Sequence, residues 1–102
     1  MKAAPRQRRK SLTLPAILDM GSTQGLKDSL IAALDQSLVL RLNGSKTQLV
    51  STPAVQVLLA ASLAAEAGGG KTILLNPSPS LRSAFQDLGL ASRLNEWGAA
   101  DA

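Results

Sequence analysis

The sequence contains no cysteine and no histidine among its 102 residues. These absences exclude disulfides, thiolate chemistry, Cys/His zinc sites, Ser-His-Asp triads and phosphohistidine relays. We interpret Asp19, Asp28 and Asp35 as capping or solvated charges, because no base or nucleophile converges with them. We therefore predict that the protein is not an enzyme and that it holds neither a metal ion nor a cofactor.

Aromatic residues and long apolar runs are also scarce. Phe85 and Trp97 are the two aromatics, and their helical spacing to leucines predicts core packing. Two isolated rings form no stacking platform for bases, so we expect no nucleic-acid partner. No stretch approaches the roughly 20 apolar residues of a membrane span, and no apolar segment of a secretory signal follows the N-terminus. These absences predict a cytoplasmic protein without membrane insertion.

Basic charge is concentrated at the N-terminus. Five of the eleven basic residues fall within residues 1–10, which leaves six basic against seven acidic residues in the remainder. We interpret residues 1–10 as a disordered, solubilising basic tail, with nucleic-acid binding through phosphate contacts as the alternative. A chain of this length allows one domain, which we place at residues 11–97. A flexible C-terminal tail is predicted at 98–102.

Strand-like and helical patterns alternate along this domain. Pro15 predicts an interruption or an edge position in the first extended segment. The expected elements are strands at 12–18, 37–42, 47–50 and 71–75, with helices at about 23–35, 52–67, 80–88 and 90–97. We therefore predict the α/β class: a single domain with a mixed, mostly parallel sheet of about four strands and helices packed against it.

A run of three glycines at 68–70 ends the helix predicted at 52–67, because glycine accepts the left-handed conformation of a C-terminal cap. The tripeptide Gly70-Lys71-Thr72 also resembles the end of a phosphate-binding loop. Such a loop joins a strand to a helix and needs glycine where Ala65 stands, whereas this segment joins a helix to a strand. The glycines therefore indicate a helix end rather than a nucleotide site.

The segment Ser51-Thr52-Pro53-Ala54 links the extended piece at 47–50 to the apolar helix at 52–67. Proline fits the first helical position, which makes Thr52 the predicted N-cap. Two hydroxyls at a helix N-terminus lie where the dipole favours phosphate groups and acidic partners. This segment is the leading candidate for a functional site.

The order of elements and this loop together resemble a STAS domain, the fold of anti-sigma-factor antagonists, over about Leu12 to Leu94. The family loop reads Asp-Ser-Ser-Gly-Leu or Asp-Thr-Ala-Gly-Leu, followed by an apolar helix. Aligned without a gap, Ser51 takes the aspartate position and Thr52 the first hydroxyl. Pro53 takes the second hydroxyl or the alanine. Ala54 takes the glycine and Val55 the leucine.

The resemblance implies a regulatory protein whose usual switch is altered. In phosphorylated antagonists the second hydroxyl is the serine that the partner kinase modifies, and Pro53 cannot accept a phosphate. The loop is closer to STAS proteins that act as standing interaction modules. Those include chemotaxis-operon proteins that bind a histidine kinase, and the accessory subunit of the lipid-asymmetry ABC transporter.

Two interpretations of function follow from the resemblance. In the first, the chain is an adaptor that docks on a histidine kinase or an anti-sigma serine kinase, and its partner-binding residues are Ser51, Thr52, Pro53, Ala54 and Gln56. In the second, it binds the ATPase of a lipid-asymmetry-type transporter. Ser51 and Thr52 are also candidate phosphorylation sites. The same residues are equally consistent with a plain helix start, and the partner and the oligomeric state stay open.

Overall fold

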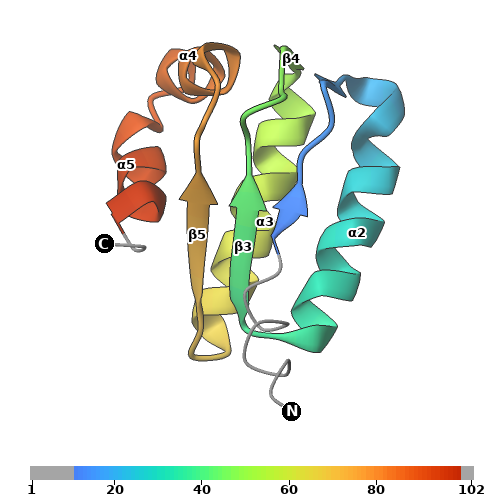
Figure 1. Ribbon diagram of the computed structural model, residues 1–102, viewed down its shortest axis with the longest axis vertical. Coiled ribbons are helices and arrows are strands. Elements are labelled where there is room, and N and C mark those ends of the chain that lie inside the picture. Colours follow the sequence, from blue (N-terminus) through green and yellow to red (C-terminus); the bar gives the residue numbers. More distant parts are fainter. Residues whose placement is uncertain (1–10, 100–102) are drawn as a thin grey trace.

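The computed structural model describes residues 11–99, so the tail predicted at 1–10 and residues 100–102 lie outside the described part. Figure 1 shows parallel strands with helices against them. In chain order the elements are β1 (Leu12–Thr13), β2 (Ile17–Leu18), the short 3-10 helix η1 (Met20–Ser22), α2 (Thr23–Gln36), β3 (Val39–Asn43), β4 (Leu49–Val50), α3 (Thr52–Ala67), β5 (Lys71–Leu75), α4 (Pro79–Asp87) and α5 (Ala91–Ala99).

The strands form a three-stranded sheet in the order β1-β3-β5 and a two-stranded sheet that pairs β2 with β4. All of these pairs are parallel. The first extended segment is split as predicted, because Pro15 has no N–H to donate. The Thr47 hydroxyl donates to the Pro15 carbonyl at 3.1 Å across this gap. The predicted α/β fold is confirmed, with the first expected strand divided into two short strands.

Helices α2 and α3 pack side by side. In Figure 1, α3 lies behind the sheet and α2 lies to the right of β1. α2 turns Leu26 and Leu30 inward. α3 buries six residues along its length: Ala54, Val55, Leu58, Ala61, Ser62 and Ala65. None of the helices between residues 11 and 99 is long and apolar enough to cross a membrane.

The turn between α3 and β5 is formed by the predicted glycines. Gly69 has a φ of +92°, which a residue with a side chain rarely adopts. A Cβ at Gly70 would collide with the backbone carbonyl of Leu38. The turn therefore brings β5 directly beside the start of β3, and α3 ends at the glycines as predicted.

Helices α4 and α5 begin and end differently from the predicted bounds. Ser78 caps α4, two residues before the start predicted at 80: its Oγ accepts the backbone N–H of Leu81 at 3.1 Å. Pro79 then occupies the first helical position, where its missing N–H costs nothing. α5 continues to Ala99, two residues beyond the domain boundary predicted at 97.

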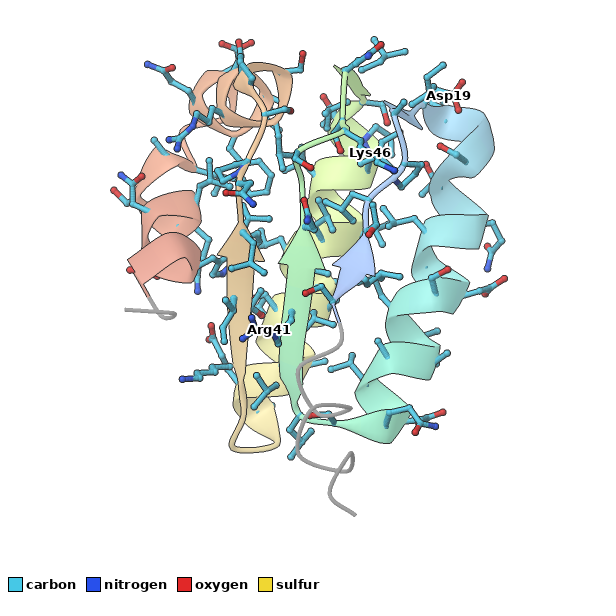
Figure 2. The ribbon with its side chains drawn as sticks, in the orientation of Figure 1. Asp19, Arg41 and Lys46 are labelled. Atoms are coloured by element: carbon cyan, nitrogen blue, oxygen red, sulfur yellow. The ribbon has the colours of Figure 1, made fainter. Side chains whose placement is uncertain are left out.

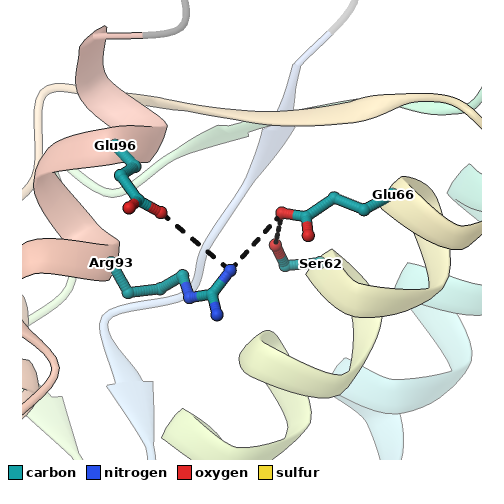
Figure 3. Close-up of polar contacts among 4 residues, drawn as sticks. All are labelled: Ser62, Glu66, Arg93 and Glu96. Atoms are coloured by element: carbon teal, nitrogen blue, oxygen red, sulfur yellow. Dashed lines mark hydrogen bonds and ion pairs between the residues drawn. The ribbon is translucent and has the colours of Figure 1, made fainter.

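Both aromatic residues belong to the core, as predicted. Phe85 of α4 is 0% exposed and Trp97 of α5 is 2% exposed. Their rings meet edge to face, with centroids 5.4 Å apart. A polar cluster also links α5 to α3 (Figure 3), in which Arg93 lies 3.5 Å from Glu66 and 4.0 Å from Glu96. The buried aromatic pair and this partly exposed cluster together attach α5 to the domain.

Candidate functional site

The candidate site lies where β4 passes into α3. The backbone N–H of Ser51 donates to the carbonyl of Leu18 at 2.8 Å, which ties the turn to the end of β2. Ser51 itself is extended, with φ −88° and ψ 159°. Because β2 and β4 are paired in parallel, both strands end at the edge where α3 begins. The turn is thus held by two strands and a helix.

The helix cap differs from the prediction by one residue. Ser51, not Thr52, is the N-cap, and its Oγ accepts the backbone N–H of Ala54 at 3.3 Å. Thr52 is the first residue of α3, which puts Pro53 at the second helical position. The extended backbone of Ser51 aims its hydroxyl at the first turn, which is the geometry that an N-cap requires.

This arrangement weakens the predicted attraction for phosphate. An anion at a helix N-terminus is held by N–H groups that have no partner within the helix. Pro53 has no N–H, and that of Ala54 is occupied by the Ser51 hydroxyl. The first turn of α3 therefore offers few free donors to an anion.

The predicted site residues differ in their accessibility. Thr52 and Gln56 are exposed, and Ser51 and Pro53 are half-buried. Ala54 is 0% exposed and belongs to the hydrophobic core. Including Ala54 among the partner-binding side chains was therefore a mistake, since its methyl group faces the core.

An apolar surface that the sequence did not predict lies beside this turn. Ile17 and Leu49 are paired across β2 and β4, and they are 52% and 53% exposed. Met20 follows in η1 and is 75% exposed. Their neighbours Leu18 and Val50 point into the protein. Alternation along each dipeptide could have suggested that one residue faces out, but not that the two outward residues meet.

Few charges surround this apolar surface. Figure 2 shows Asp19 and Lys46 at the end of the molecule where β4 lies, whereas Arg41 lies further down the sheet. The Asp19 carboxylate accepts the backbone N–H of Ser22 at 3.0 Å and so caps η1, as predicted. Across residues 11–99 there is no group of three or more acidic side chains that could hold a metal ion.

Comparison with known proteins assigns the family. The model of the STAS domain family matches residues 3–97. This chain belongs to the STAS domain family, and the resemblance noted in the sequence is confirmed.

The chain is also similar to a solved structure, that of the anti-sigma factor antagonist SpoIIAA in its unphosphorylated form. The identity is 28% and the TM-score 0.67, over 82% of this chain and 78% of that chain. No curated protein matches the sequence significantly.

Proposed function

We propose that this protein is a non-enzymatic STAS adaptor of the cytoplasm. It binds a signalling kinase, either a chemotaxis-type histidine kinase or an anti-sigma serine kinase. The surface that we assign to this contact, called the docking surface below, consists of Ser51, Thr52, Pro53, Gln56, Ile17, Met20 and Leu49. The similarity of the chain to an anti-sigma factor antagonist supports a regulatory role.

The observation that carries the proposal is the exposed pair Ile17 and Leu49 beside the capped turn. Single exposed apolar residues are common, but adjacent ones rimmed by polar groups mark interaction surfaces. Thr52 and Gln56 are exposed polar residues of the adjoining start of α3. Burial of these apolar side chains by a partner would provide the affinity, and the short side chains of the turn allow its backbone to come close.

The same geometry argues for a contact that does not depend on phosphorylation. Pro53 carries no hydroxyl, and the Ser51 hydroxyl is engaged with the Ala54 N–H. Thr52 is the most accessible hydroxyl of the turn. A phosphate there would find little of the helix N-terminus free to stabilise it. We therefore propose that the docking surface binds its partner constitutively and is not regulated by phosphorylation.

The test is a direct binding measurement against purified candidates encoded by neighbouring genes. We expect the full chain to bind a histidine kinase or an anti-sigma kinase, and Thr52→Glu to weaken that complex, because a carboxylate would enter the contact. Binding to a transporter ATPase in place of either kinase would overturn the signalling assignment. A complex that tolerates Thr52→Glu unchanged would contradict the assigned surface.

A further inference from the structure

A second surface lies on the opposite side of α2 and α3 from the sheet. The two helices enclose a groove of about 420 Å³. Its walls are mostly apolar, and α3 contributes small side chains that leave room for another helix to approach: Val57, Ala60, Ala61 and Ala64. Lys27 and Ile31 line the groove from α2.

The outer side of α2 carries a charge pattern that is complementary to the same pattern on a second, antiparallel α2. Lys27, Ile31 and Asp35 are spaced four residues apart, so they follow one another along neighbouring turns of the helix. Ile31, in the middle, is 50% exposed. Lys27 and Asp35 are exposed and, within residues 11–99, form no ion pair. The apolar centre thus has a positive end and a negative end at equal distances.

We propose that the groove is occupied by a second copy of this chain, with the two α2 helices antiparallel about a two-fold axis at Ile31. A two-fold interface makes each contact twice. Lys27 then faces the partner's Asp35, and Asp35 faces the partner's Lys27. Ile31 packs against its own symmetry mate above the groove. An anionic lipid or an acidic peptide would match Lys27 but leave Asp35 opposed by nothing, so charge complementarity favours the second copy.

The size of the face sets the expected strength. With 14 and 16 residues, α2 and α3 are about 21 and 24 Å long. A face of two such helices lies at the lower end of specific interfaces, so we expect a reversible dimer with a Kd in the micromolar range. Pro53 and Gln56 also line the groove. Dimerisation would therefore compete with the docking surface for these two residues.

The test uses the full chain alone, so its outcome is independent of the proposed kinase contact. Sedimentation across a concentration series should show a monomer–dimer equilibrium. Lys27→Glu and Asp35→Lys should each raise the Kd about tenfold, since attraction becomes repulsion at two symmetric places. An equimolar mixture of the two variants should restore dimers, because Glu at 27 of one chain then meets Lys at 35 of the other, while Asp35 of the first chain meets Lys27 of the second. No change within one molecule can produce this rescue.

A matched control comes from an exposed position of α3 that lies outside the groove. Leu63 is 48% exposed and does not line the groove, so Leu63→Asp should leave the Kd unchanged. Ile31→Asp should abolish dimers by placing two carboxylates on the axis. Circular dichroism on each variant checks that the monomer is folded. A chain that stays monomeric up to ~1 mM, or a dimer that the charge variants do not weaken, would overturn the proposal.

Discussion

The Oγ of Ser51 accepts the backbone N–H of Ala54 at 3.3 Å, which closes the first turn of α3. This bond makes Ser51 a structural residue rather than a free hydroxyl. It also leaves Thr52 as the exposed hydroxyl of the turn. The two residues, adjacent in sequence, therefore have different roles, and substitution separates them.

Ser51→Ala should lower the free energy of unfolding by about 1 kcal/mol, the usual effect of removing an N-cap. Thr52→Ala should change it by less than ~0.5 kcal/mol, since the side chain is exposed at the first helical position. Urea denaturation of both variants provides the comparison. Equal losses, or a larger loss at Thr52, would show that the cap is assigned to the wrong residue.

Ala54→Arg should destabilise the protein by about 3 kcal/mol or more, because the position is fully buried and the new charge finds no partner there. Gln56→Arg, two residues on at an exposed position, is the control and should be tolerated. Thermal unfolding distinguishes the two. An Ala54→Arg variant as stable as the parent would mean that this side chain reaches solvent.

Attachment of α5 should depend on Trp97 more than on the ion pairs in Figure 3. Trp97→Ala should lower the free energy of unfolding by about 3–5 kcal/mol, since it removes a buried ring packed on Phe85. Arg93→Ala should lower it by less than ~1 kcal/mol, because the Arg93 and Glu66 side chains are 33% and 45% exposed and solvent screens them. A reversed ranking in urea denaturation would be inconsistent with this packing.

Phosphorylation offers a prediction about regulation. Incubation of the chain with its candidate kinase and ATP should leave the intact mass unchanged, because Pro53 has no hydroxyl and Ser51 is engaged in the cap. Thr52 is the residue to monitor by fragmentation. Stoichiometric phosphate on Thr52 that releases the partner would contradict the standing docking surface.

Hydrophobic periodicity and glycine predicted most of the fold. α3 ends at Ala67 and β5 begins at Lys71 as expected. Three consecutive glycines favour a helix end there, because glycine readily adopts the left-handed conformation of a C-terminal cap. Proline likewise marked the break in the first strand segment. These signals are local, so the sequence alone carries them.

The helix caps were harder to predict because more than one hydroxyl lies near each proline. Ser51 and Thr52 both precede Pro53, and Ser78 and Ser80 flank Pro79. In α3 the proline takes the second helical position, and in α4 Pro79 takes the first. Residue preferences allow either choice. The outcome depends on where the preceding backbone becomes extended, which tertiary contacts such as the Ser51 N–H to the Leu18 carbonyl decide.

The apolar part of the docking surface could not be predicted for a different reason. Ile17 and Leu49 become neighbours only when two distant segments pair in parallel register. A slip of one residue in either strand would turn the exposed side chain of that strand inward. Ala54 shows the converse, since nothing in its local sequence distinguishes a small residue on the surface from one in the core.

The central claim, that a signalling kinase docks on the Ile17–Leu49 end of the domain, is tested most directly by calorimetric titration of the kinase with two variants. Leu49→Asp places a carboxylate within the docking surface, and Leu63→Asp makes the same change at a similarly exposed leucine on the far part of α3. We expect Leu49→Asp to weaken binding at least ~10-fold and Leu63→Asp to leave it unchanged. Equal affinities for the two variants would contradict the claim.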